Sequence, residues 1–358
     1  MKKISVIIAI AALAASAACT KIVSDDASPA KRVTFFAANY VPQTKAGEVS
    51  FLSEFADPAN AQFKSKGFLH AEGVSTTQDF FGADGETITW NATAKEWAPS
   101  HDYYWPKGAS SYVNFVSWYD TGVGPTTATE TTLEWANRTI GTGDNIMYAD
   151  EAWRFKENNN PATYTAIDGV QEGVPTLFHH ALSQIKIQAR ATKVSNGTAT
   201  WTITLKEIKV KDIYNQGTLT LTNSDPSTDK TPKAWTGDWA VSGTKGNLTP
   251  ANLALTATNQ DLLANQSVLP QALSEIALEF KLEIVTAYSS TVSNTEIITK
   301  SIPFYAASGE AFSNSISNWE QNKKYIYTLV VEPSEKRVLF DPAVETDWET
   351  VTVPEKNI

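Results

Sequence analysis

The sequence is poor in the residues that most often carry chemistry or crosslink a fold: it has 358 residues but one cysteine, Cys19, and four histidines. A single cysteine cannot form an intramolecular disulfide, so apolar burial and backbone pairing must hold the fold together. Only two histidines are adjacent in the sequence, and in a strand these would point to opposite faces, where they could not bind the same ion. We therefore expect no metal and no cofactor. The histidines are His70, His101, His179 and His180.

Several sequence signatures are also missing. There is no Gly-x-Ser-x-Gly elbow, phosphate-binding loop or His-Glu-x-x-His motif, which argues against the common nucleophilic and metal-dependent hydrolases. Acidic residues outnumber basic ones by 39 to 29, giving a formal net charge of -10, so a basic face for nucleic acid is not expected. Paired carboxylates for glycoside hydrolysis stay open, because such pairs meet only in space. Carboxylates are plentiful, including Asp144, Asp150, Glu151 and Asp347, but the sequence singles out no pair among them.

What is present begins with residues 1–18, which have the three parts of a secretory signal peptide: Lys2 and Lys3, an apolar run, and small residues up to Ala18. Cys19 follows directly, as in bacterial lipoproteins, whose cysteine thiol carries a diacylglycerol and whose new amino end carries a third acyl chain. One chain holds a protein to a membrane only marginally, whereas several hold it stably. We expect Cys19 to be lipidated; the alternative is a plain cleaved signal followed by an accidental cysteine.

Residues 19–32 are small, polar and charged, which predicts a lipid-anchored tether without a core of its own. The first predicted strand is Val33–Tyr40. The polar residues 41–47 that follow predict a loop, in which Lys45 would be reachable by a protease. No later apolar stretch approaches the roughly 20 residues that a membrane-spanning helix requires.

The rest of the chain shows the two-residue period of half-buried strands. Residues 276–284 alternate between apolar and mostly polar side chains, and residues 201–205 do the same. The parity then changes before Ile208, which predicts a bulge near Glu207. No long stretch has the period of a helix, so the predicted fold is all-β, with antiparallel sheets packed as sandwiches.

About 340 residues after the signal are comfortable for two domains. The segment from Asn158 to Pro175 is rich in Asn, Gly and Pro, so we place a domain boundary near residue 175, between an N-terminal β-sandwich (33–175) and a C-terminal one (176–358). Eleven tryptophans suggest a carbohydrate platform, but several lie within or beside predicted strands, which favours core packing.

Local patterns in both halves resemble the fimbrillin-like lipoproteins that build type V pili and related surface structures in the Bacteroides group. Each pattern is short, and it is their order behind a lipoprotein signal that makes the combined match specific. They are Tyr103–Pro106 (YYWP), Val113–Trp118 (VNFVSW), Asp144–Ala149 (DNIMYA), Leu177–Ile187 (LFHHALSQIKI), Leu269–Gln271 (LPQ), Lys324–Leu329 (KYIYTL), Phe340–Pro342 (FDP) and Asp347–Trp348 (DW).

The resemblance implies two tandem transthyretin-like β-sandwich domains and an assembly route. In polymerising fimbrillins, a trypsin-like protease removes the lipid-bearing amino end with its first strand, and a strand from a neighbouring subunit fills the groove. Family members typically have an Arg in the loop after that strand, where this sequence has Lys45. Arg32 is the other candidate, although cutting there would leave the strand in place. An uncleaved, anchored subunit is the alternative.

The resemblance also suggests the carboxyl end as the inserted donor strand, with Trp348, Val351 and Val353 as its apolar side chains. The alternative is that this tail completes the sheet of its own second domain. The leading hypothesis is therefore a structural or adhesive fimbrial subunit without an active site, anchored in the outer membrane and exposed at the cell surface. It would bind other subunits by strand addition, and a host or bacterial surface ligand. A non-polymerising lipoprotein that binds glycan or host protein through exposed aromatics is the second hypothesis, and an enzyme the third.

Overall fold

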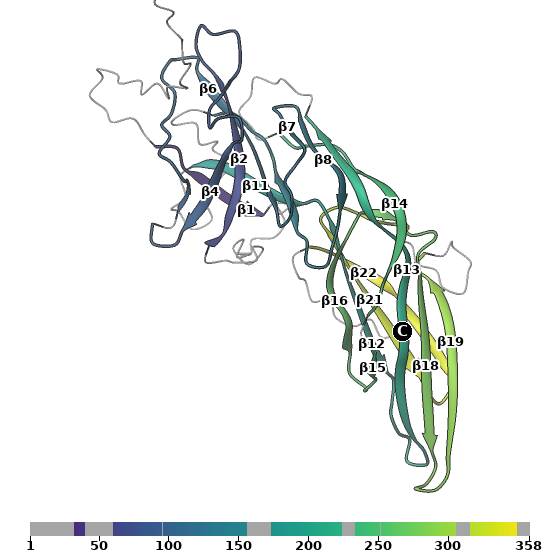
Figure 1. Cartoon of the computed structure of the whole chain (residues 1–358). Coiled ribbons are helices and arrows are strands. Elements are labelled where there is room, and N and C mark those ends of the chain that lie inside the picture. Colours follow the sequence, from purple (N-terminus) through teal and green to yellow (C-terminus); the bar gives the residue numbers. More distant parts are fainter. Residues whose placement is uncertain are drawn as a thin grey trace, which may run out of the picture.

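The computed structural model describes residues 32–39, 60–94, 96–155, 173–223, 233–250, 252–305 and 316–348. These residues form strands and connecting segments without an α-helix, so the all-β prediction is confirmed for them, and no described helix could cross a membrane. The molecule is elongated, with the first strands at one end and the hairpin of β18 and β19 at the other (Figure 1). Cys19, Lys45, Val351 and Val353 lie outside the described residues.

One end of the molecule is a nine-stranded sheet with the order β10-β6-β9-β11-β1-β5-β4-β2-β3. A further pairing, between β2 and β6, closes this sheet on itself. Its interior is filled by aromatic side chains, among them Phe63, Trp97 and Phe178. The strands are β1 (Phe35–Asn39), β2 (Gln62–His70), β3 (Gln78–Asp79), β4 (Glu86–Asn91), β5 (Glu96–Pro99), β6 (Tyr112–Asp120), β9 (Ile146–Ala149), β10 (Ala152–Phe155) and β11 (Val174–His180).

The other end has a seven-stranded and a four-stranded sheet, whose apolar side chains share one large core. Leu205 and Leu282 come from the first sheet, Ile185 and Tyr327 from the second, which makes this part a β-sandwich. The seven strands are β7 (Thr127–Ala128), β8 (Thr132–Thr139), β13 (Thr200–Thr222), β14 (Trp239–Leu248), β15 (Leu253–Ala254), β18 (Ala277–Ala287) and β19 (Ser293–Pro303). The four are β12 (Ser183–Ala191), β16 (Gln260–Val268), β21 (Lys323–Glu332) and β22 (Arg337–Asp347), and a small extra pair is β17 (Gln271–Ala272) with β20 (Asn318–Trp319).

Strand β13 is 23 residues long and links the two ends of the molecule. Its first half pairs with β18, and the register shifts between Leu205 and Glu207, which confirms the predicted bulge. Its second half pairs with β8, a strand from the first half of the chain. Residue 175, where we placed a domain boundary, lies inside β11, which pairs with β9 and β1. The domain limits stay a prediction.

A third apolar cluster lies between the two ends and contains Leu182, Leu219 and Trp135. Two indole N–H groups form hydrogen bonds at this cluster. Trp235 Nε1 donates to the carbonyl oxygen of Ala149 at 2.9 Å, and Trp239 Nε1 donates to the carbonyl oxygen of Ala181 at 2.7 Å. The prediction that tryptophan serves core packing is confirmed for the nine that are buried. These are Trp97, Trp105, Trp118, Trp135, Trp201, Trp235, Trp239, Trp319 and Trp348.

Candidate functional site

The first predicted strand, now β1, lies inside the nine-stranded sheet rather than at its edge. On one side it runs parallel to β11, with Phe35 opposite Val174 and Asn39 opposite Phe178. On the other side Phe35 pairs with Trp97 of β5. Val174 N donates to Thr34 O at 2.8 Å, so ordinary backbone hydrogen bonds hold the strand in place.

Alternate side chains of this segment enter the core of the sheet. Val33, Phe35 and Ala37 are 0%, 1% and 7% exposed, whereas Thr34 and Phe36 are only half-buried. The Phe35 ring lies 5.4 Å from that of Phe115 and 5.9 Å from that of Phe63, both near edge-to-face. Burying a side chain of this size is worth about 2–3 kcal/mol. Removing β1 would therefore leave a groove with apolar pockets and unpaired backbone groups along it.

The backbone that leads into β11 lies directly against β1. A Cβ atom on Gly173 would stand 2.7 Å from the carbonyl carbon of Phe35 and 2.9 Å from the oxygen of Thr34. Such contacts are too short for any side chain, so only glycine allows this approach. The sequence does not single out Gly173, because a glycine in a Gly-rich segment is typical of a loop.

A polar network supports the start of β1. Val33 N donates to Tyr103 O at 2.8 Å, and the Tyr103 hydroxyl donates to Glu86 Oε2 at 2.9 Å. Glu86 also accepts from the Ser100 hydroxyl at 2.6 Å and from Thr87 N at 2.9 Å. Burial alone would raise the pKa of the Glu86 carboxyl, but the hydrogen bonds from Ser100, Thr87, His101 and Tyr103 outweigh it and lower the pKa.

Arg32, the predicted alternative cleavage site, precedes β1 and is held in place. Its guanidinium pairs with Glu96 and, at 3.2 Å, with Asp102. The hydrogen bond to Asp102 is the largest of several effects that raise the pKa of the arginine. The backbone of Arg32 also forms an isolated bridge with Tyr104. A protease would have to break these contacts to bind Arg32 in an extended form.

Trp348, the first residue of the predicted donor tail, directly follows β22 and is buried against its own chain. Its ring stacks on His180 of β11, with ring centroids 4.2 Å apart and planes 13° apart. Its backbone N donates to Asn322 O at 3.2 Å. Phe178 of the same strand β11 pairs with Asn39 of β1. Trp348, the last described residue, therefore lies beside β11, the strand that neighbours β1. The structure brings Trp348 near the candidate groove but not into it.

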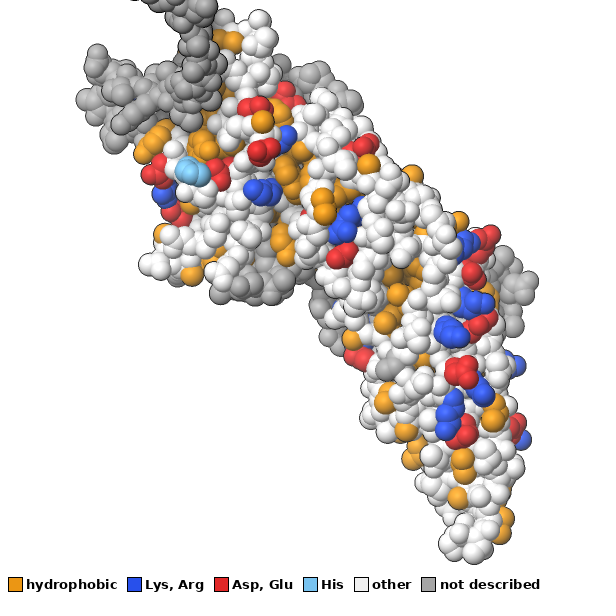
Figure 2. Space-filling view, viewed as in Figure 1, with side chains coloured by type: hydrophobic (Ala, Val, Ile, Leu, Met, Phe, Trp, Pro, Cys, Tyr) orange, Lys and Arg blue, Asp and Glu red, His pale blue; other side chains and the backbone are white. Residues whose placement is uncertain are grey.

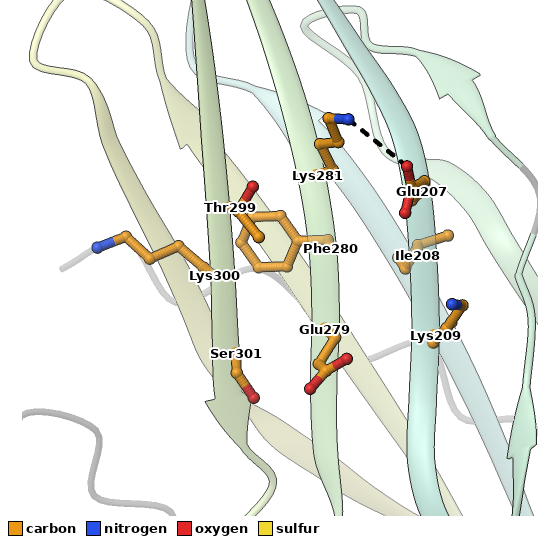
Figure 3. A pocket seen from close by; sticks show the side chains of 9 residues that line it. All are labelled: Glu207, Ile208, Lys209, Glu279, Phe280, Lys281, Thr299, Lys300 and Ser301. Atoms are coloured by element: carbon orange, nitrogen blue, oxygen red, sulfur yellow. Dashed lines mark ion pairs between the residues drawn. The ribbon is translucent and has the colours of Figure 1, made fainter.

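A shallow hollow of about 440 Å³ lies on the outer face of β13, β18 and β19 (Figure 3). Its two carboxylates face lysines: Glu207 lies 3.6 Å from Lys281, and Glu279 lies 3.0 Å from Lys211. Acidic and basic side chains alternate over this end of the molecule (Figure 2). Such a mixture is typical of a solvated sheet face, where exposed pairs add little stability.

Together these features define an all-β protein of stacked sheets whose amino-terminal strand is built into the middle of a closed sheet. The chain belongs to the fimbrillin-like family, because a family profile of that description matches residues 67–348. The expected family is thereby confirmed. No match was found among curated proteins.

Solved structures of proteins from Bacteroides species match this chain. A fimbrial protein from Bacteroides vulgatus ATCC 8482 matches with a TM-score of 0.53 and 15% identity, over 88% of this chain and 99% of that one. A candidate cell adhesion protein from Bacteroides uniformis ATCC 8492 matches with a TM-score of 0.47 and 15% identity, over 88% of this chain and 98% of that one. At this identity, the first match supports the fold.

Proposed function

We propose that this protein is an adhesive fimbrial subunit of the cell surface, assembled when β1 is removed and a strand from another subunit takes its place. One observation carries the proposal: residues 33–39 supply an internal strand and three core side chains to a sheet whose next described strand begins only at Gln62. Family membership and the similar fold of the B. vulgatus fimbrial protein support it. The role is structural, with no catalytic step.

The anchor and its release are part of the same proposal. Cys19 carries the lipid that holds the new subunit to the outer membrane, and residues 19–32 span the distance to β1. Cleavage after Lys45 separates β1 from the body of the protein, whereas cleavage after Arg32 leaves β1 attached. The contacts of Arg32 with Glu96 and Asp102 favour Lys45.

The replacing strand must repeat the chemistry of β1. It needs apolar side chains at alternate positions, to fill the sites of Val33, Phe35 and Ala37, and a free backbone to bond with β11 and β5. We assign this role to the tail that contains Val351 and Val353. Trp348 then marks where the tail leaves its own subunit, held on His180. The proposal also includes the domain organisation, in which two tandem transthyretin-like domains are divided near residue 175.

The test is intact mass and amino-terminal sequencing of protein shed from cells and of protein retained on them. A new amino end at Ala46 in the polymeric fraction is the expected result, and Lys45→Ala should abolish it while Arg32→Ala leaves it unchanged. Acylated Cys19 on every surface copy would overturn the processing step. The alternative, a glycan-binding lipoprotein, would need a row of exposed tryptophan rings, and the nine buried ones are not available for it.

A further inference from the structure

Strand β19 is the long, regular edge of the seven-stranded sheet. All eleven of its residues pair with β18 without a register shift, and among the described strands none pairs with its other side. Eight of the eleven residues are exposed. The strand lies along the outer margin of the molecule (Figure 1). Its outward backbone N–H and C=O groups can therefore receive another strand.

The other described sheet ends are protected in the ways proteins commonly use. Strands β3, β7 and β10 are only two to four residues long. Strands β14, β16 and β22 are longer, but each has register shifts against its neighbour. Short or bulged edges resist pairing with a second sheet, whereas a long edge without a bulge is a template for it.

The sequence of β19 is complementary to itself. In an antiparallel pair of two copies centred on Ile298, Glu296 of each copy faces Lys300 of the other, and Ile297 faces Thr299. A pair centred on Glu296 or on Lys300 would instead place like charges opposite each other, which is unfavourable. These two are the only charged residues of the strand. Charge thus selects the register centred on Ile298.

The side chains have the freedom that this register needs. Lys300 is exposed, makes no ion pair with a described residue and points away from Lys281 and Glu279 (Figure 3). Glu296 pairs with Lys336 at 2.7 Å and remains 36% exposed, so its carboxylate can accept a second cation. Ile297 is 56% exposed and would be covered on pairing.

We propose that two copies of this protein join side by side through β19, forming one sheet that continues from subunit to subunit. The partner is a second copy of the chain, because the strand matches itself in both charge and register. The contact lies far from β1, so it is independent of strand replacement at the other end of the molecule. It would link anchored subunits or neighbouring filaments laterally.

The test uses the full chain on cells, with Ile298→Cys to place a thiol on the two-fold axis and a short thiol-specific crosslinker. A dimer band is expected for Ile298→Cys and not for the parent chain. Thr295→Cys lies in the same strand but faces Ser301 of the partner, so it should give little crosslinked dimer. Absence of the Ile298→Cys dimer at native surface density, or an equal yield from Thr295→Cys, would overturn the proposal.

Charge variants in the Ile298→Cys background test the register. Lys300→Glu or Glu296→Lys alone places like charges opposite each other twice and should lower the yield by about tenfold. The double variant restores opposite charges and should restore the yield. Lys209→Glu, an exposed lysine on the face of the same sheet, is the matched control and should have no effect. A double variant as weak as the single variants would contradict the pairing.

Discussion

At the scale of single residues, Phe35 is the main anchor of β1. Its ring is 1% exposed and contacts Phe63, Phe81 and Phe115. Truncating a buried phenylalanine removes its transfer free energy and leaves a cavity, which typically costs about 3–5 kcal/mol. We expect Phe35→Ala to lower the free energy of unfolding by this amount in urea denaturation. Phe36→Ala, on the half-buried face of the strand, should cost less than half as much.

Glu151 makes stability depend on pH. Its side chain is fully buried, Asn223 Nδ2 donates to Oε2 at 2.7 Å, and Oε1 has no hydrogen-bond partner. Burial, aided by the charge of Glu130, raises the pKa of this carboxyl to about 9. The folded state thus holds the proton more tightly than the unfolded state. The resulting stabilisation is complete below the unfolded pKa and is lost as the pH rises towards 9.

Glu151→Gln should remove this dependence, because the amide keeps an acceptor for Asn223 and carries no charge. Relative to the natural protein, the variant should gain about 4 kcal/mol in its free energy of unfolding as the pH rises from 5 to 8. Urea denaturation of both proteins at the two pH values measures this difference. If the difference in free energy of unfolding between the two proteins stayed constant with pH, Glu151 would be ionised in the folded state.

The roles of single residues were the least predictable from sequence. Glu151 was a candidate only as one of several acids, and its burial depends on segments far away in the chain, such as Asn223. The role of Gly173 could not be predicted from the sequence either, because this residue acts by letting its own backbone approach that of β1. Patterns of alternation report which face a side chain occupies, but not which distant strand lies against it.

At the scale of elements, the bulge in β13 is the best test of register. Lys206 is the extra residue: Leu205 faces Leu282 and Glu207 faces Lys281, while those two are adjacent in β18. Deleting Lys206 keeps both Leu205 and Ile208 on the core side, so we expect a cost below about 2 kcal/mol. Deleting Thr204 instead turns one flank of the strand inside out and should prevent folding. Thermal unfolding by circular dichroism distinguishes the two; equal losses would contradict this assignment.

Strands were predictable where one face is buried, because a period of two residues is then imposed by the core. Segment 201–205 lies in β13, segment 276–284 overlaps β18 from Ala277 on, and the first predicted strand contains β1. The partner of each strand was not predictable. The parallel pairing of β1 with β11 joins residues far apart in sequence, and no local pattern specifies such a partner.

At the scale of the whole molecule, β13 contributes side chains both to the core of the β-sandwich and to the apolar cluster between the two ends. Its residues contribute Leu205 and Ile208 to one core cluster and Leu219 and Leu221 to the next. We expect the two halves of this strand to open in one cooperative event. Native-state hydrogen exchange should give the same opening free energy for amides on both sides of Asp212. Two distinct plateaus would show that the clusters unfold separately.

The pairing of β8 with β13 also limits how such proteins can diversify. A hybrid gene joined at residue 175 would set Leu133 and Trp135 from one parent against Leu219 and Leu221 from the other. Recombination there breaks a matched set of side chains, even though both parents share an architecture. Recombination between genes of related proteins should therefore exchange exposed loops, such as the loop between β18 and β19, more often than whole halves of the chain.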